Sequence, residues 1–388
     1  MYDAIVIGVG GMGSAALYHL SLRGARVLGL EQFDIPNDRG SSHGITRIIR
    51  VAYWEHPDYV PLVRRAYTLW RELERDTGER LLVITGCVDA GPGNSAHIAG
   101  VRHACAAFQL EHQEYDSDEL RRRFPGYRLA ADTVAILQPE GGFVRPERCT
   151  SAHVGGARRR GAEVRTRERV IDWSTRRGAI HVKTDRGEYD AQQLIVTAGA
   201  WTSSLLPQLA RSLSPERQVM LWTDPVRPDF FQVDMFPVFY IDVAEGAFYG
   251  FPVYEVPGFK IGKYHHRFER VDPDTMDREC HPEDEEALRQ AIRRYFPDAN
   301  GPTLAMKTCL FTNTYDEHFV IDVLASNPRL VVAAGFSGHG YKFCSIVGEI
   351  LADLALDGGT RHNISLFEVG RLTTNAQRPT TNDRKPND

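Results

Sequence analysis

The stretch YDAIVIGVGGMGSAALYHLSLRGARVLGLEQFD, Tyr2 to Asp34, decides the fold class of this 388-residue chain. Ala4 to Ile7 are apolar, the residues from Gly8 to Gly13 form a glycine-rich turn, and apolar residues then recur at helical spacing. A second apolar run, Arg26 to Leu30, ends at Glu31. Strand, turn, helix and strand in this order predict a βαβ unit.

The glycines of this turn fit a dinucleotide-binding pattern. Gly8, Gly10 and Gly13 match G-x-G-x-x-G, and Glu31 follows 23 residues after Gly8, at the end of the next strand. Such glycines let the backbone approach a pyrophosphate at the helix N-terminus, and the carboxylate can accept hydrogen bonds from a ribose. The context predicts a dinucleotide site without choosing between NAD and FAD. Alternatively, the turn serves only to pack the helix on the sheet.

Further elements extend the nucleotide-binding part. Helices are predicted over Tyr59 to Asp76 and Pro146 to Arg160. Leu194 to Trp201 and Leu330 to Gly340 are short apolar runs that lead into small residues and glycine, as buried parallel strands do. We therefore assign to the nucleotide-binding domain the segments 1–81, 139–216 and 308–370.

The intervening segments have a different pattern. Residues 82–138 and 217–307 are rich in alternating aromatic and β-branched side chains, which favours antiparallel strands. The sequence thus predicts an α/β fold, with a Rossmann-like domain interleaved with a sheet-rich substrate domain. Residues 371–388 are polar and are expected to form a loose tail.

Composition excludes several classes of partner. The chain has 46 Lys+Arg against 51 Asp+Glu, and its two arginine triplets are far apart, so no nucleic-acid footprint is present. No apolar run approaches the roughly 18 residues of a membrane span. Six cysteines without CxxC spacing indicate neither a disulfide framework nor a metal site. We expect a cytoplasmic protein without metal, membrane or nucleic-acid partners.

The stretch GSSHGITRIIR, residues 40–50, places Arg47 and Arg50 on either side of an apolar pair. Both guanidiniums could lie in solvent on a surface segment. Alternatively, one lies near the cofactor and the other binds a substrate carboxylate, because arginine suits bidentate binding.

Four separated segments together resemble one family. GSSHGITRIIR, GFKIGKYHH followed by DPDT, KTCLFT followed by DEHFVID, and GFSGHGYKF are similar to signature segments of the monomeric sarcosine oxidase and N-methyltryptophan oxidase family. They occur in the same order and at similar spacing, and the resemblance runs from Tyr2 to about Phe367. It implies FAD as the cofactor and a D-amino acid oxidase-like fold.

The resemblance gives Cys309 a role. This residue matches the cysteine that the family joins to FAD through a thioether, whereas by itself it would be interpreted as a buried structural thiol. A thiolate is the attacking species in such a reaction, so a cationic neighbour is expected. Lys307 or the segment from His43 to Arg47 could supply that cation.

The resemblance also implies how substrate and oxygen are handled. Arg50 and Lys342 match the pair that holds the substrate carboxylate, and these distant residues would have to converge on one pocket. Tyr249 matches an active-site tyrosine. Lys260 matches a lysine over the flavin ring, where a preplaced charge promotes reaction with oxygen.

The family's active-site histidine corresponds to His265, with His266 as the alternative, because Lys263 is one residue more than the family pattern has. Arg47 matches an arginine beside the flavin, and GFSGHGYKF makes a second glycine turn before a helix predicted over Tyr341 to Leu356. The predicted catalytic residues are Lys260, Arg47, His265 and Tyr249; the substrate-binding residues are Arg50, Lys342 and Tyr249; the cofactor-binding residues are Gly8, Gly10, Gly13, Glu31, His43, Arg47, Val170, Cys309, Gly338, Gly340 and Lys342.

These residues imply an FAD-dependent oxidase of a secondary amino acid such as sarcosine, which acts as a monomer and reduces oxygen to hydrogen peroxide. Trp54 and Tyr240 add bulk near the expected pocket, so N-methyltryptophan, pipecolate and proline remain open as substrates. Two alternatives remain: a nicotinamide-dependent dehydrogenase, and a flavin-holding partner subunit without catalysis.

Overall fold

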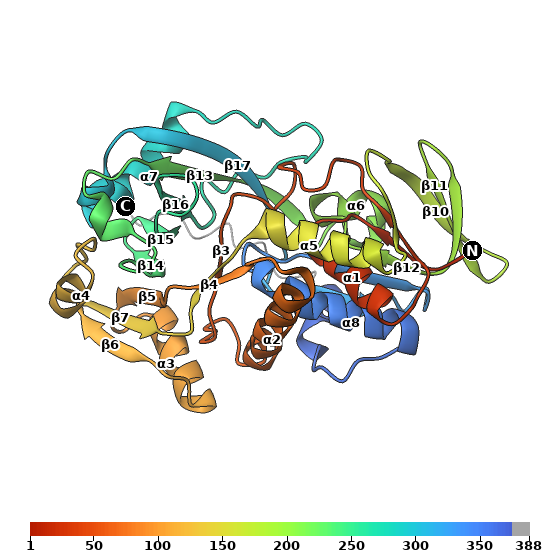
Figure 1. Cartoon of the computed structure of the whole chain (residues 1–388), viewed down its shortest axis with the longest axis horizontal. Coiled ribbons are helices and arrows are strands. Elements are labelled where there is room, and N and C mark those ends of the chain that lie inside the picture. The colour runs from red at the N-terminus through yellow and green to blue at the C-terminus, as the bar shows by residue number, and fades with distance from the viewer. Residues whose placement is uncertain (375–388) are drawn as a thin grey trace.

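The computed structural model describes residues 1–374, which form three sheets. Figure 1 shows the strands of the two large sheets in different halves of the molecule, with β3 and β4 of the small sheet between them. The small sheet is antiparallel, and its strands are β3 Arg47–Ile49, β8 Gly142–Val144 and β4 Leu82–Ile84.

The first large sheet has a parallel centre. β9, β2, β1, β12 and β19 lie side by side and are parallel, β18 pairs antiparallel with β19, and β10 and β11 form an antiparallel extension beside β12. The strands are β1 Tyr2–Ile7, β2 Val27–Leu30, β9 Glu163–Arg165, β10 Val170–Arg176, β11 Ala179–Thr184, β12 Glu188–Val196, β18 Val320–Val323 and β19 Leu330–Ala334. Their central runs are buried, as the sequence predicted for parallel strands.

Helices from distant parts of the chain cover this sheet. α1 packs against both α5 and α8. The helices of this half are α1 Gly11–Leu22, α2 Tyr59–Thr77, α5 Pro146–Arg159, α6 Thr202–Leu205, α8 Cys344–Asp357 and α9 Gly370–Thr374. The predictions for α2 and α5 are confirmed to within one residue at each end. The helix expected from Tyr341 instead begins with a 3₁₀ turn over Tyr341–Phe343, and α8 follows it.

The second large sheet is antiparallel except between β5 and β14. In spatial order its strands are β17 Thr303–Asn313, β13 Ser214–Thr223, β16 Phe259–Lys263, β15 Gly246–Phe251, β14 Val238–Val243, β5 Cys87–Pro92, β7 Thr133–Gln138 and β6 Gln113–Asp116. Its helices are α3 Ala96–Phe108, α4 Ser117–Arg123 and α7 Pro282–Tyr295. α7 packs on β13 and β16, and the shared core contains Phe239, Phe259 and Phe296.

The predicted domain boundaries at 216/217 and 307/308 fall inside β13 and β17, so these two long strands continue from one half of the molecule into the other. The division into two domains stays a prediction. Of the predicted tail, 371–374 belong to α9, and the remainder lies outside the described residues.

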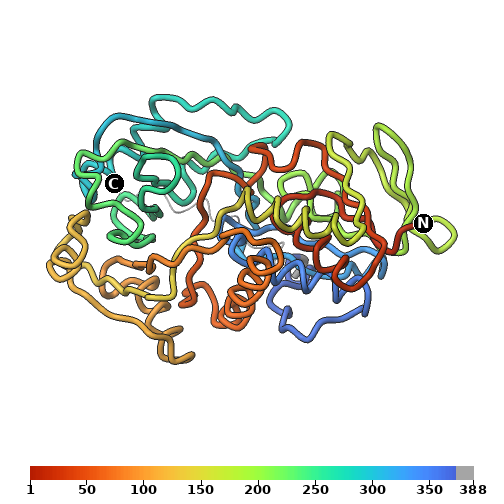
Figure 2. Tube along the Cα trace, in the orientation of Figure 1, coloured from red at the N-terminus to blue at the C-terminus, as the bar shows by residue number. Residues whose placement is uncertain are grey.

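The parallel pairing brings the two ends of the described chain together. β12 lies between β1 and β19, so the turns that follow these three strands open at the same edge of the sheet. In Figure 2 the red N-terminal and blue C-terminal segments run beside each other in this half of the molecule.

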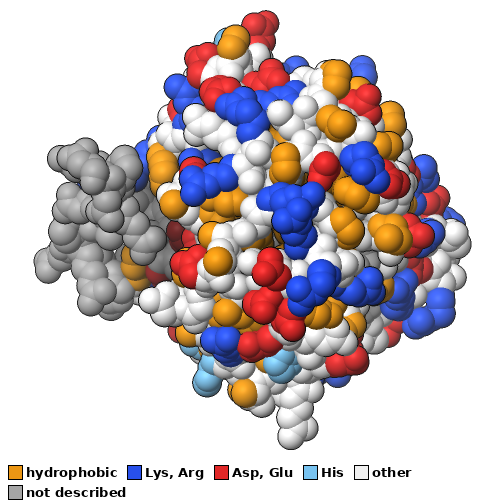
Figure 3. Space-filling model, turned by 90° about the vertical axis from the view of Figure 1, so that its left-hand side faces the viewer, with side chains coloured by type: hydrophobic (Ala, Val, Ile, Leu, Met, Phe, Trp, Pro, Cys, Tyr) orange, Lys and Arg blue, Asp and Glu red, His pale blue; other side chains and the backbone are white. Residues whose placement is uncertain are grey.

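None of the helices within residues 1–374 is long and apolar enough to cross a membrane. In the same part of the chain, no group of three or more His, Cys, Asp or Glu side chains is arranged to hold a metal ion. On the face shown in Figure 3, basic side chains are interspersed with acidic and hydrophobic ones.

Candidate active site

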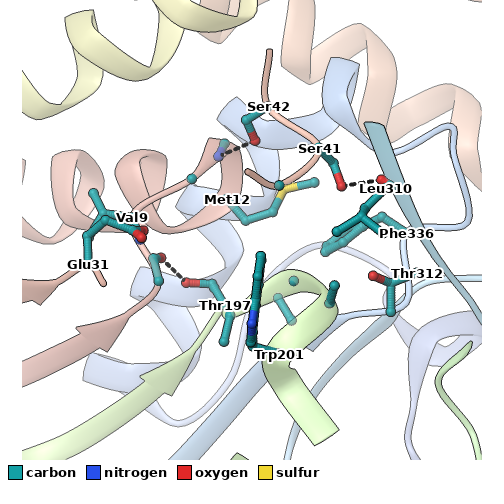
Figure 4. A pocket seen from close by; sticks show the side chains of 18 of the residues that line it. Val9, Met12, Glu31, Ser41, Ser42, Thr197, Trp201, Leu310, Thr312 and Phe336 are labelled. Atoms are coloured by element: carbon teal, nitrogen blue, oxygen red, sulfur yellow. Dashed lines mark hydrogen bonds between the residues drawn. The ribbon is translucent and has the colours of Figure 1, made fainter. Parts of the chain in front are cut away.

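A single cavity lies at the carboxyl ends of β1, β12 and β19 and reaches β17 (Figure 4). Open α/β sheets bind ligands at this edge. The predicted cofactor-binding residues that line it are Gly8, Gly10, Glu31, Arg47, Val170, Cys309, Gly338 and Gly340. Residues from both glycine turns and the cysteine of β17 therefore share one cavity.

The first glycine turn packs tightly against its own helix. A Cβ atom on Gly13 would lie 1.9 Å from the carbonyl oxygen of Gly8 and 2.6 Å from Oγ1 of Thr197. Gly13 thus lies beneath the turn and lets α1 begin close to β1. Its contribution to the site is this close packing, and Gly8 and Gly10 line the cavity itself.

Glu31 is fixed at the end of β2 by two backbone groups. Its Oε2 accepts a hydrogen bond from Val9 N at 2.8 Å, and its Oε1 accepts one from Phe33 N at 3.0 Å. Burial raises the pKa of this carboxyl group, and the two backbone bonds oppose that effect. Figure 4 shows Glu31 beside Val9 at one end of the cavity.

The second glycine turn closes over β17. Gly338 has a φ of +76°, and a Cβ atom there would lie 2.4 Å from the ring of Phe311. Both facts require glycine, because the left-handed conformation and the close aromatic ring each disfavour a side chain. The turn thereby meets the strand that carries Cys309 and Phe311.

Cys309 is buried in β17, and its nearest charged neighbour is Arg47. The Sγ atom lies 3.5 Å from Nη2 of Arg47, which also donates to the carbonyl oxygen of Ser41 at 3.1 Å. Of the two expected sources of positive charge, Lys307 instead pairs with Asp38 at 3.2 Å. Arg47 is therefore the cation placed against the thiol.

His43 lines a neighbouring cavity together with Gly44 and Lys307. Its ring is buried and Nε2 has no hydrogen-bond partner. Burial, with the charge of Arg47 next in importance, lowers the pKa of His43 to about 3. The imidazole is therefore neutral near pH 7.

Lys260 is buried in β16 and is held by the segment that precedes Arg47. Its Nζ donates to the carbonyl oxygens of Gly44 and Thr46 at 2.7 and 2.8 Å, and to Oγ1 of Thr46 at 3.1 Å. It also lies 4.3 Å from the ring centre of Phe251. Burial, with the charge of Arg47 next, lowers the pKa of Lys260 well below its usual value.

Arg50 and Lys342, which the sequence analysis expected to converge on one pocket, both lie beside Tyr53, and neither lines the main cavity. Nζ of Lys342 donates to the hydroxyl of Tyr53 at 3.2 Å and to the carbonyl oxygen of His339 at 2.7 Å. The guanidinium of Arg50 lies 5.6 Å from the centre of the same Tyr53 ring. Burial and the nearby charge of Arg50 lower the pKa of Lys342 to about 7.

Comparison with known proteins identifies the relatives of this arrangement. The family model for FAD dependent oxidoreductases matches residues 3–354. The chain is 44% identical to a monomeric sarcosine oxidase of Streptomyces avermitilis, over 96% of this chain and 98% of the relative. It is 32% identical to an N-methyl-L-tryptophan oxidase of Yersinia pestis, over 96% of this chain and 99% of the relative.

The chain belongs to the sarcosine oxidase and N-methyltryptophan oxidase family of FAD-dependent oxidoreductases. A solved structure of NikD, an unusual amino acid oxidase essential for nikkomycin biosynthesis, superposes with a TM-score of 0.83 at 26% identity, over 95% of this chain and 97% of that one. The predicted fold class, a Rossmann-like domain with a sheet-rich partner, is thereby confirmed.

In this member of the sarcosine oxidase family, Arg50 is already paired with carboxylates that the sequence analysis did not single out. Its Nη1 lies 3.2 Å from Oδ1 of Asp89 and its Nη2 3.4 Å from Oε1 of Glu55. Gln138 donates to Oδ2 of Asp89 at 2.7 Å and accepts from Ala52 N at 2.7 Å. The sequence did contain a signal for this pairing, because Asp89 is an acid within the buried run CVDAG, residues 87–91.

Tyr249 lies on β15 opposite Tyr240 of β14, and its ring packs against Gly262 of β16. Burial raises its pKa well above the usual value, and the nearby charge of Arg47 opposes this. Tyr240 in turn lies 4.8 Å from the ring of His97 and 5.3 Å from the guanidinium of Arg50. Tyr249 and Tyr240 thus lie between the Arg47 and Arg50 regions.

His265 and His266, the two candidates for the family's active-site histidine, pair with different carboxylates. His265 pairs with Glu216 at 3.0 Å and with Glu317 at 3.1 Å. Burial lowers the pKa of His265, but the hydrogen bonds to Glu216 and Glu317 outweigh burial and raise the pKa to about 9. His266 is buried against Asp284 at 3.0 Å, and burial lowers its pKa. Neither histidine is among the residues that line the main cavity.

Proposed function

We propose that this chain is an FAD-dependent oxidase that converts a secondary amino acid, such as sarcosine, to an imine, which water then hydrolyses to an amino acid and an aldehyde. One observation carries the proposal. A cavity bounded by two glycine turns contains Cys309 and Arg47, and the cations Arg50 and Lys342 converge on Tyr53 in the same molecule.

The cavity fits an elongated dinucleotide. Val170 and Glu31 line it together with the first glycine turn, where an adenosine end would lie, and Cys309 lines it together with the second turn. The turns leave no space for side chains at Gly13 or Gly338. FAD, when bound there, supplies the acceptor for the two electrons of amine oxidation and is reoxidised by oxygen.

The residues of the chain would bind and orient the substrate. Lys342 and Arg50 provide the positive charge for its carboxylate, and fixing that group relative to the cofactor makes the reaction nearly unimolecular. Both side chains are about 5% exposed, so a substrate held by them is shielded from bulk water. We assign to Lys260 a positive field that favours reaction with oxygen; burial disfavours its charge, and the three oxygens that accept hydrogen bonds from its Nζ favour it.

Finer features of the function are also part of the proposal. A thioether from Cys309 would anchor the cofactor, supported by the position of Arg47 against the thiol at 3.5 Å. The relatives named monomeric sarcosine oxidases support a monomer. Hydrogen peroxide would be the second product, because oxygen is the proposed acceptor. A cytoplasmic setting stays a prediction from the sequence.

A bulkier substrate is the second candidate. Trp54 packs edge-on against His97 at 5.4 Å, and His97 packs on Tyr240, so the three rings form a row that reaches Arg50 through Tyr240. Aromatic rings of this kind favour contact with an aromatic or cyclic amino acid, and one relative is an N-methyl-L-tryptophan oxidase.

The test is anaerobic bleaching of the purified yellow protein by a panel of amino acids. We expect sarcosine or another N-methyl amino acid to bleach the flavin, with pipecolate, proline and N-methyltryptophan measured in parallel to rank the two candidates. Admitting oxygen should restore the colour and produce hydrogen peroxide. A yellow protein that none of these compounds bleaches would contradict the proposal and favour a flavin-holding subunit.

A further inference from the structure

The register of β16 determines which of its side chains share a face. Lys260 and Gly262 alternate with Phe259 and Ile261, and the latter two lie in the core beneath α7. The ladder continues one residue beyond the strand, because Tyr264 N donates to Ala247 O at 2.9 Å. Successive side chains alternate between faces, so Tyr264 lies on the face of Lys260.

His265 lies beyond this ladder, in the turn that follows β16. Its backbone has a φ of +53°, outside the extended conformation of the strand, and its ring stacks on the exposed ring of Phe268 at 5.3 Å. The extra residue Lys263 thus changes which side chain continues the Lys260 face. In this chain that side chain is a tyrosine.

Tyr264 contacts the second glycine turn without lining the main cavity itself. Its hydroxyl donates to Ser337 O at 2.6 Å, and Ser337 lines the main cavity. Burial raises its pKa well above the usual value, as do the neighbouring Glu317, Tyr240 and Glu55. Tyr264 is in turn among the groups that raise the pKa of Tyr53, the residue that Lys342 contacts.

The Tyr264 hydroxyl has a second partner, Glu317, which is partly exposed to solvent. Oε2 of Glu317 lies 3.3 Å from the Tyr264 oxygen, and Oε1 of the same carboxylate pairs with His265. The side chain of Glu317 is 44% exposed. Burial raises the pKa of Glu317, but His265 outweighs this and the net pKa is lowered, so the group is a carboxylate at neutral pH.

We propose that Tyr264, which continues the Lys260 face one residue beyond β16, faces the substrate and passes the substrate's amine proton to Glu317. The amine N–H bond breaks as its proton moves to the Tyr264 oxygen. The hydroxyl hydrogen, rotated from Ser337 O, forms an O–H bond on Oε2 of Glu317, which then releases a proton to water. His265 is a positioning residue, because its charge holds Glu317 as the acceptor.

This inference rests on the proposed amine oxidation, since a secondary ammonium group must lose a proton before it can be oxidised. General acid–base groups contribute about 10²-fold or more to such steps. We therefore expect Tyr264→Phe to slow anaerobic flavin reduction about 10²-fold at pH 7. Glu317→Gln, which keeps Tyr264 and cannot accept the proton, should slow it in the same direction.

The measurement is the rate of anaerobic flavin reduction between pH 6 and 10. If Tyr264 relays the proton, Tyr264→Phe should lower the reduction rate most at low pH, where the amine is protonated. The decrease should be smaller at high pH, where free amine binds directly. Affinity for propionate, an amine-free carboxylate, should remain at the wild-type value. Tyr295→Phe is the matched control, because it removes the hydroxyl of the last residue of α7, which donates to Glu245.

Two results would overturn the inference. One is a Tyr264→Phe variant with the wild-type rate and pH profile, and the other is a slowing equal at every pH and accompanied by lost propionate affinity. If no secondary amino acid bleaches even the wild-type protein, the proposed function fails instead. The wild-type result therefore separates the two failures.

Discussion

At the scale of single residues, the site depends on which charges remain unpaired. Arg50 is matched by Asp89 and Glu55, both of which lie within ion-pairing distance. The described hydrogen bonds of Lys342 go to neutral oxygens, the hydroxyl of Tyr53 and the carbonyl of His339. The affinity of the site for a carboxylate should therefore vary with the protonation of Lys342.

This leads to a pH prediction for Lys342. Its pKa is lowered to about 7, so the free site loses positive charge as the pH rises through that value. Because a carboxylate binds the charged form, the dissociation constant of propionate should rise about tenfold per pH unit above 7. Perturbation of the flavin absorbance on titration with propionate measures it.

The control for this titration is Lys342→Met. This variant should bind propionate weakly, and its dissociation constant should change little between pH 6 and 9. A wild-type dissociation constant that stays constant over the same range would show that Lys342 does not provide the titrating charge. His339, whose pKa burial lowers to about 3, stays neutral throughout.

At the scale of elements, the glycine turns determine how closely helices approach strands. The periodic patterns predicted α2 and α5 well, because each has a wide apolar face and a clear first turn. The 3₁₀ turn before α8 was not predicted, since it depends on the backbone leaving the glycine turn at Gly340. Local geometry of this kind has little signal in apolar periodicity.

Gly13→Ala tests the packing of α1 on β1. The added Cβ would lie 1.9 Å from Gly8 O, so the helix must move away from the strand. We expect the free energy of unfolding to fall by about 3 kcal/mol or more, with loss of bound flavin. Urea denaturation and the flavin-to-protein absorbance ratio provide the measurements.

Gly155→Ala in α5 is the matched substitution. Its Cβ would meet only Nη1 of Arg159, at 3.7 Å. It should be neutral or stabilise the protein by about 0.5 to 1 kcal/mol, because alanine favours the helix. Equal destabilisation by the two variants would mean that close approach at Gly13 is unimportant.

At the scale of the whole molecule, the main cavity is assembled from segments that are distant in the chain. Its lining includes Gly8 near the N-terminus, Val170 and Thr197 in the middle, and Cys309 and Gly338 near the end. A ligand that contacts all of these segments stabilises the folded state as a unit, because the unfolded chain cannot bind it.

Cys309→Ala makes that coupling measurable. Acid precipitation should leave flavin on the wild-type protein and release it from the variant. The stripped variant should melt at a lower temperature, and FAD at about 100 times its dissociation constant should restore about 2.7 kcal/mol of stability. Thermal denaturation with and without added FAD measures this.

Cys105→Ala is the control, because Cys105 is buried in α3 and does not line the cavity. It should keep its flavin through acid precipitation. Flavin released from the wild-type protein would rule out the thioether. A melting temperature of the stripped variant that does not respond to FAD would remove FAD from the cavity.

The sequence by itself determined the βαβ unit, the main helices, the parallel strands and the residues that resemble a family signature, because each is encoded in local spacing. It also predicted that Arg50 and Lys342 must converge. Only the tertiary structure decided that Asp89 and Glu55 pair with Arg50 and that the strand ladder of β16 extends to Tyr264. Those facts depend on strand register and on partners distant in the chain, which no local pattern records.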